Sequence, residues 1–187
     1  MATQIAPYAD LLSAYKDAEP LPDTYNADGK SLYNPPGPRS SAYDEFRAPI
    51  DSSNNGFDFH IYYMQAIDSQ KEYARALHER IRREFPELRI YRFWEKPIGP
   101  HPVAMFEVNT FTPHQTGTLI SWLVVHRGPC SVLVHPNTGD AYADHTELAT
   151  WIGKSWPLHV DILKHEARFG PNAQRPVQNG QNQSQQP

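Results

Sequence analysis

The stretch that decides the fold is Phe57-Asp58-Phe59-His60-Ile61-Tyr62-Tyr63, in which large apolar side chains alternate with more polar ones. Successive side chains of a β-strand point to opposite faces of the sheet, so this alternation is typical of a strand with two different faces. Every second residue from Phe57 onward forms an apolar face that should pack against helices. His60 lies at the centre of the opposite, polar face, and Tyr62 is on the same side.

Two amphipathic helices are predicted after this strand. The first runs from Ser69 to Phe85, where Ser69 and Glu72 form the pattern of a capping box and large residues recur at every fourth position. The second begins after Thr112, because a threonine followed by a proline is a common helix start. Three further strands are predicted, at residues 88–94, 101–109 and 131–135.

The resulting order is strand, helix, strand, strand, helix, strand, which is the βαββαβ pattern of ferredoxin-like domains. We therefore predict an α+β fold, a ferredoxin-like sandwich whose two helices cover the same face of the sheet, because both crossovers are right-handed. The first strand should lie between the third and the fourth and run antiparallel to both. The open face would carry His60, His101, Glu107 and His135, and we expect a second copy of the chain to close it in a homodimer.

The composition divides the 187 residues into three parts. Residues 1–55 are rich in proline and tyrosine and should form an extended arm. Residues 56–165 hold the predicted strands and helices, with one more edge strand between Trp156 and Leu163. Residues 166–187 are rich in glutamine and asparagine, and we expect this tail to be disordered.

Charge and hydropathy exclude several classes of protein. The formal net charge of -4 and the absence of a basic stripe argue against a nucleic-acid partner. No apolar run is long enough to span a membrane, and the N-terminus lacks the basic and apolar segments of a signal peptide. The single cysteine, Cys130, cannot form an internal disulfide, which fits a reducing compartment. We therefore expect a cytoplasmic protein without membrane contacts.

The turn after the last strand carries two histidines on short, rigid supports. His135 ends the strand, and His145 follows in the first turn of a short helix that Asp144 should cap and Gly153 should end. At that position the helix macrodipole disfavours an imidazolium. A neutral imidazole is what a metal site or a general base requires, so both roles are open to these residues.

The open face offers ligands for a divalent metal. His60, at mid-strand, can approach either His135 with Glu107 or His101, and the register that decides between them cannot be read from the sequence. Two histidines and a carboxylate are the ligands of non-haem Fe(II) centres that react with O2. No short metal-binding motif is present, so structural or merely exposed histidines are the alternative.

Three stretches carry a resemblance to a known family: Phe57–Tyr63, Gly99–Val108, and Val132–Asp140 followed by Asp144-His145. Their sequences and their spacing resemble those of the DOPA 4,5-dioxygenase family, in its small fungal and bacterial form. The resemblance covers about residues 56–163. The Asn-Pro-Pro-Gly-Pro-Arg-Ser-Ser stretch at residues 34–41 is similar to the fungal branch.

The resemblance implies an enzyme, a non-haem Fe(II)-dependent extradiol dioxygenase that opens a catechol such as L-DOPA with O2, by 4,5- and also by 2,3-cleavage. The site residues that we expect on this basis are the metal ligands His60 and His135 with His101 as the third, the catalytic residues His145 and Glu107, and a substrate contact, Tyr62. Glu107 is the alternative third ligand in place of His101. The alternatives are cleavage of another catechol, a zinc-dependent hydrolase on the same face, and a non-catalytic dimeric module that binds a small molecule.

Overall fold

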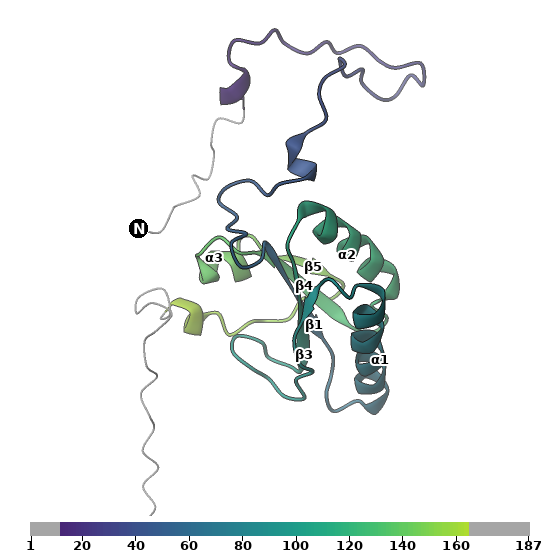
Figure 1. The fold of residues 1–187 in the computed structure, drawn as a ribbon, viewed down its shortest axis with the longest axis vertical. Helices are drawn as coiled ribbons and strands as arrows, with labels where there is room; N and C mark the ends of the chain where they lie inside the picture. Colours follow the sequence, from purple (N-terminus) through teal and green to yellow (C-terminus); the bar gives the residue numbers. More distant parts are fainter. Residues whose placement is uncertain (1–11, 165–187) are drawn as a thin grey trace, which may run out of the picture. The chain divides into compact units, whose positions relative to one another are not determined.

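The computed structural model describes residues 12–164 of the chain (Figure 1). The chain divides into two compact units, Met1–Ser41 and Ala42–Pro187. Residues 42–55, which the composition groups with the arm, belong to the second unit. The tail that we expect to be disordered, residues 166–187, lies outside the described residues.

The first unit is described over residues 12–41, and none of these residues is buried. It contains a single-turn 3-10 helix, η1 (Ser13–Tyr15), and a hairpin-like turn that an isolated antiparallel bridge between Tyr25 and Leu32 closes. The Asp28 carboxylate stabilises this turn by accepting hydrogen bonds from the backbone two and three residues further on. The described part of this unit therefore has no hydrophobic core of its own.

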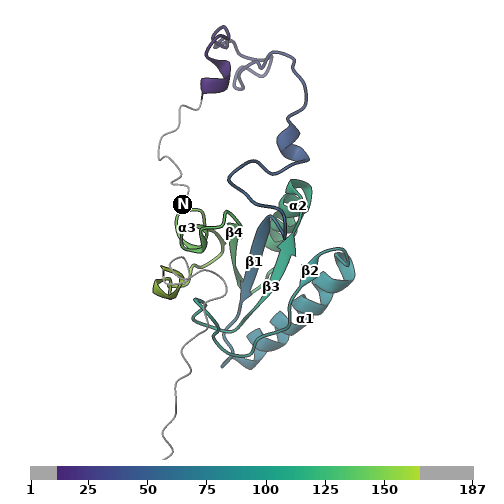
Figure 2. The ribbon, with the colours of Figure 1, turned by 60° about the vertical axis from the view of Figure 1, so that its left-hand side comes forward.

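The second unit has the predicted βαββαβ order, followed by a short helix and a fifth strand. Its elements after the 3-10 helix η2 (Ser41–Tyr43) are β1 (Phe57–Tyr62), α1 (Asp68–Glu84), β2 (Arg89–Ile90), β3 (Met105–Thr110), α2 (Pro113–His126), β4 (Ser131–Pro136), α3 (Ala141–His145) and β5 (Thr150–Ile152). The strands form one sheet in the order β2-β3-β1-β4-β5, with β1 antiparallel to both neighbours. Figures 1 and 2 show α1 and α2 on the same face of this sheet, so the predicted ferredoxin-like α+β fold is confirmed.

The main core lies between the sheet and these two helices. Phe59 and Ile61 of β1 are fully buried there, together with Phe106 of β3. The helices contribute Leu77 and Leu119, among other apolar side chains. Burying one such side chain stabilises the fold by about 1.5–3 kcal/mol. The alternation predicted for β1 is thus confirmed, and it directs His60 to the opposite face.

On that opposite face a second apolar cluster covers part of the sheet. It is built on Tyr62 of β1 and Leu133 of β4, and Trp151, Trp156 and other partly buried residues pack against it. The segments around β5 therefore cover by themselves some of the face that we expected a second copy to close. Assembly into a homodimer stays a prediction. No helix within residues 12–164 has the length and the apolar composition that crossing a membrane would require.

Several element boundaries differ from the sequence predictions. α1 has Ile67 at its N-cap, whose side chain accepts no hydrogen bond, so the capping box predicted at Ser69 is wrong. β2 is only two residues long. The third strand starts later than predicted because His101 instead closes a tight turn with Ile98. The extra edge strand is β5, and residues 156–163 form no strand.

The start of α2 is confirmed, and it gives a stability prediction. The Thr112 hydroxyl accepts a hydrogen bond from the backbone N–H of Gln115, and the Gln115 side chain accepts one from the backbone N–H of Phe111. Thr112→Ala should lower the free energy of unfolding by about 1 kcal/mol, because it removes this cap. Urea unfolding would measure the change. Thr118→Ala, on an exposed position of the same helix, is the control, and equal effects of both variants would contradict the prediction.

Candidate metal centre

The strand register brings two histidines of the open face together. His60 lies opposite Glu107 of β3, while Asp58, two residues earlier, lies opposite His135 of β4. The rings of His60 and His135 therefore meet diagonally between β1 and β4, with their Nε2 atoms 3.0 Å apart. Both side chains are almost completely buried, with exposed fractions of 4% and 2%.

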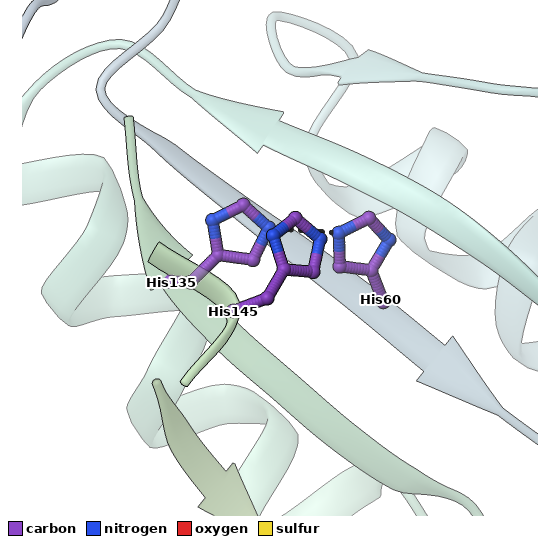
Figure 3. Close-up of side chains that lie close together, drawn as sticks. All are labelled: His60, His135 and His145. Atoms are coloured by element: carbon purple, nitrogen blue, oxygen red, sulfur yellow. Dashed lines mark hydrogen bonds between the residues drawn. The ribbon is translucent and has the colours of Figure 1, made fainter. Parts of the chain in front are cut away.

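A third ring comes from the short helix that follows β4. The chain turns at Gly139, which has a φ of 86°, and α3 then places His145 over the same face. The centroid of the His145 ring is 4.1 Å from that of His135 and 5.8 Å from that of His60. One ring nitrogen from each of the three histidines lies within 4.8 Å of the other two (Figure 3). We call these three residues the histidine triad.

Backbone carbonyls fix the tautomers of two of these rings. The Nδ1 atom of His135 lies 2.8 Å from the carbonyl oxygen of Pro136, and that of His145 lies 2.9 Å from the carbonyl oxygen of Ala141. A carbonyl can only accept, so each Nδ1 must carry the hydrogen. The Nε2 atoms of His135 and His145 are therefore left with lone pairs. A hydrogen bond to the far nitrogen is the usual way in which proteins orient a metal-binding histidine.

Burial keeps the imidazoles of this face neutral. Desolvation and then the neighbouring histidines hold the pKa of His60 well below its usual 6.5. For the same reasons the pKa of His101 falls to about 3 and that of His145 to about 4. Burial also lowers the pKa of His135, against the opposing effect of the nearby Asp58 carboxylate. Neutral rings with available lone pairs are ready to bind a metal at neutral pH.

The reason expected for a neutral His145 was wrong. Asp140, not Asp144, is the N-cap of α3 and accepts a hydrogen bond from the backbone of Ala143, so His145 is the last residue of the helix. The Asp144 carboxylate instead accepts hydrogen bonds from the backbone and the hydroxyl of Thr138, which ties the helix to the preceding turn. At the end of a helix the macrodipole would favour the imidazolium. Burial among other histidines therefore outweighs it.

His101 and Tyr62 form a pair beside the triad. The His101 ring centroid is 4.3 Å from that of His60, and its Nδ1 atom is 2.7 Å from the Tyr62 hydroxyl. Burial raises the pKa of Tyr62, so the phenol keeps its proton. Trp151 packs against the Tyr62 ring at 5.4 Å between centroids. His101 therefore belongs to the same histidine cluster, although its Nδ1 atom is already bonded.

Glu107 lies on the outer side of His60. Its Oε2 atom is 3.8 Å from Nδ1 of His60, which is the nitrogen that points away from His135. Burial, followed by the repulsion from Asp58, raises the pKa of Glu107 to about 7. Nδ1 of His60 is buried without a hydrogen-bond partner. Glu107 thus flanks the triad at the far nitrogen of a histidine.

Sequence reasoning overlooked four polar residues that surround these groups: Asp58, Arg89, Asn55 and Asn109. Asp58 points to the same face of β1 as His60, and this alternation was the one signal in the sequence that could have identified it. Its Oδ2 atom is 3.9 Å from Nε2 of His135. The amides of Asn55 and Asn109 each donate a hydrogen bond of 2.5 Å to its other oxygen.

The histidine triad fits a divalent metal ion. Within the described residues, these three side chains form a cluster that can hold one. Neutral imidazole nitrogens are good ligands for Zn, Cu, Fe and Ni ions. The buried and unpartnered Nδ1 atom of His60 is also consistent with a site in which that ring gains a proton at Nδ1 when its Nε2 atom binds an ion.

Comparisons with known sequences point to one family. The sequence model of the Dopa 4,5-dioxygenase family matches residues 57–162, which is more than half of the chain. An uncharacterised 21.2 kDa protein from Botryotinia fuckeliana is 54% identical over 166 residues, 84% of this chain and 91% of that protein. A DOPA 4,5-dioxygenase from Amanita muscaria is 33% identical over 125 residues, 64% of this chain and 54% of that protein.

A solved structure agrees with these sequence matches. The crystal structure of a dioxygenase candidate from Nostoc punctiforme is similar to 63% of this chain and to 94% of its own chain, with a TM-score of 0.51 and 32% identity. The matched region, 57–162, includes β1, β4 and α3 and therefore the whole histidine triad. By sequence and by fold, this chain belongs to the Dopa 4,5-dioxygenase family.

Proposed function

We propose that the protein is an extradiol ring-cleaving dioxygenase that opens a catechol with Fe(II) and O2, and that L-DOPA is the first substrate to test. The observation that carries this proposal is the convergence of three neutral imidazoles from β1, β4 and α3, of which those of His60 and His135 are buried and that of His145 is half-buried. Membership of the Dopa 4,5-dioxygenase family and the identity to the Amanita muscaria enzyme support the same reaction class.

In this proposal His60, His135 and His145 hold the metal through their ring nitrogens. A bound Fe(II) ion would supply the electron transfer between a catechol and O2 that closed-shell organic molecules and triplet O2 undergo only slowly by themselves. The chain supplies orientation, because backbone carbonyls fix two of the rings. It also excludes water, because His60 and His135 are nearly inaccessible to solvent.

We assign the acid–base role to His101 and the ligand role to His145, which exchanges the roles implied by the family resemblance. A catechol gives up hydroxyl protons as it binds a metal and reacts, so the site needs a group that accepts them. The Tyr62 oxygen can accept a hydrogen bond from Nδ1 of His101 whether the ring is neutral or charged, which leaves Nε2 to take up and return a proton. Glu107 then acts on His60 at Nδ1, the ring nitrogen that faces away from His135.

Oxygen uptake tests the proposed reaction. Chelated protein, reloaded with Fe(II) without air, should consume O2 when L-DOPA is added and form a yellow ring-opened product. Caffeate and other catechol acids test for another physiological substrate, and tyrosine, which lacks the second hydroxyl, should give no uptake. Iron-loaded protein that consumes no O2 with any catechol would contradict the proposal. Ligand binding that is indifferent to chelators would favour a non-catalytic module, and activity restored by Zn(II) would favour a hydrolase.

Two variants separate the roles of His101 and His145. His145→Gln should lose most of its bound Fe(II), because a ligand is removed. His101→Gln should keep its Fe(II) but lose about 100-fold or more in kcat, the usual contribution of a general acid–base group. Metal analysis together with oxygen uptake measures both effects. If His101→Gln loses the metal and His145→Gln keeps it, His101 is the third ligand.

A further inference from the structure

A continuous polar row crosses four strands beside the histidine triad. The register aligns His135 of β4 with Asp58 of β1, Asp58 with Asn109 of β3, and Asn109 with Arg89 of β2. The side chains of Arg89, Asn109 and Asp58 are hydrogen-bonded in the same order, and Asp58 lies beside His135. Nε of Arg89 donates to Oδ1 of Asn109 at 2.6 Å, and Nδ2 of Asn109 donates to Oδ1 of Asp58 at 2.5 Å. The row therefore connects the edge of the sheet to the triad.

Arg89 fixes which way two amides point. A guanidinium group has only donors, so the amide atom that faces it must be the oxygen. Arg89 donates to Oδ1 of Asn109 and, through a second nitrogen, to Oδ1 of Asn55 at 2.6 Å. The NH2 groups of both amides must then point toward the acidic side chains. This orientation follows from the chemistry of the groups.

The oriented amides determine which carboxylate oxygens remain free. The NH2 group of Asn109 donates to Oδ1 of Asp58 and to Oε1 of Glu107, the latter at 2.7 Å. The other oxygen of each acid has no hydrogen bond among the described residues and faces a histidine. Oδ2 of Asp58 is 3.9 Å from Nε2 of His135, and Oε2 of Glu107 is 3.8 Å from Nδ1 of His60.

We infer that Asn109, oriented by Arg89, is a positioning residue of the metal centre, which bridges Asp58 and Glu107 so that each directs a free oxygen at a histidine. This inference rests on the metal site of the proposed function. When Nε2 of His60 binds an ion, the ring must carry its hydrogen on Nδ1, and Glu107 is the acceptor beside it. The negative charge of two carboxylates next to the triad also favours the binding of a divalent cation there.

The competing explanation is that Arg89 and Asn109 only fasten the edge strand. Arg89 also donates to Asn54, so some contribution to stability is expected. A role confined to stability would lower the melting temperature of the metal-free protein and leave its metal affinity unchanged. A positioning role raises the dissociation constant for the metal, because loss of a residue around the ligands typically costs about 10–100-fold in affinity.

Co(II) affinity tests the inference, with the ion measured by competition against a coloured chelator. Asn109→Ala should raise the Kd for Co(II) by about 10–100-fold, and Arg89→Lys, which keeps the charge but not the fork of donors, should raise it by about 10-fold. The control is Arg75→Lys, an exposed arginine of α1 paired with Glu95, which should leave the Kd unchanged. If Asn109→Ala does not fold, the Kd of Arg89→Lys for Co(II) tests the inference by itself.

A double variant adds a readout that a purely structural role would not change. If Asn109 acts by positioning Glu107, the double variant Asn109→Ala/Glu107→Gln should have a Kd for Co(II) no higher than that of the single variant with the higher Kd. The reason is that the effects of substitutions within one hydrogen-bond network are not additive. An unchanged Kd in Asn109→Ala and Arg89→Lys, or effects that multiply in the double variant, would overturn the inference. Wild-type protein that binds Co(II) tightly but, loaded with Fe(II), cleaves no catechol would refute the proposed function alone.

Discussion

His60→Ala is expected to abolish stoichiometric Fe(II) binding and to reduce catechol-dependent O2 uptake by more than about 100-fold, since even residues around a ligand contribute about 10–100-fold. His60 has this effect because it is central to the cluster. Its Nε2 atom is 3.0 Å from that of His135. The centroid of its ring is 4.3 Å from the ring centroid of His101 and 5.8 Å from that of His145. Its removal leaves the histidine triad without its member on β1.

Metal analysis and oxygen uptake on the same preparation measure this result. His114→Ala is the matched control, because it removes an exposed histidine of α2. That variant should bind iron and turn over as the wild type does. His60→Ala protein that still binds one iron per chain with full activity would exclude His60 as a ligand.

The metal-free protein is expected to lose stability steeply on acidification below about pH 6.5. His60, His101, His135 and His145 all have pKa values lowered by burial, so they stay neutral in the folded state. In the unfolded chain they take up protons as the pH falls through 6.5. The unfolded state then binds more protons, and stability is lost at about 1.4 kcal/mol per histidine and pH unit.

Glu107 works in the opposite direction over part of this range. Burial raises its pKa to about 7, so the folded state holds a proton that the unfolded chain releases above 4.5. The net effect of these four histidines and Glu107 is therefore at most about three protons, or about 4 kcal/mol per pH unit. Such a slope can unfold a domain of ordinary stability, about 5–15 kcal/mol, within a few pH units.

Urea unfolding of chelated protein at several pH values measures this slope. The His145→Gln variant should have a shallower dependence, because one titrating group is removed. The pKa of His145 is about 4 in the fold, so its stabilising effect is complete above pH 6.5 and disappears toward pH 4. A free energy of unfolding that is constant from pH 7.5 to pH 5.5, or that increases on acidification, would contradict the neutral histidine cluster.

The sequence predicted the fold well because its decisive signals are local. The alternation from Phe57 to Tyr63 depends only on the period of a strand, and it correctly directed His60 away from the helices. The capping of α2 by Thr112 is a similarly local signal. The order of the strands then followed from the handedness of the crossovers.

The composition of the site needed long-range information. The approach of His60 to His135, which lie 75 positions apart in the sequence, depends on the β1–β4 register. His145 was placed in the wrong helical turn because Asp144 bonds back to Thr138 instead of capping α3. The roles of Asp58 and Asn109 depend on Arg89, which lies on the strand next to Asn109 and two strands from Asp58. No local pattern distinguishes such residues from ordinary polar ones.

The most direct test of the metal centre is a crystal structure of the protein loaded with Co(II) or Fe(II), with anomalous diffraction data collected at the absorption edge of the metal. One strong peak per chain is expected, about 2.0–2.2 Å from a ring nitrogen of each of His60, His135 and His145. A peak bound elsewhere, or fully loaded crystals in which these three rings hold no metal, would contradict this assignment.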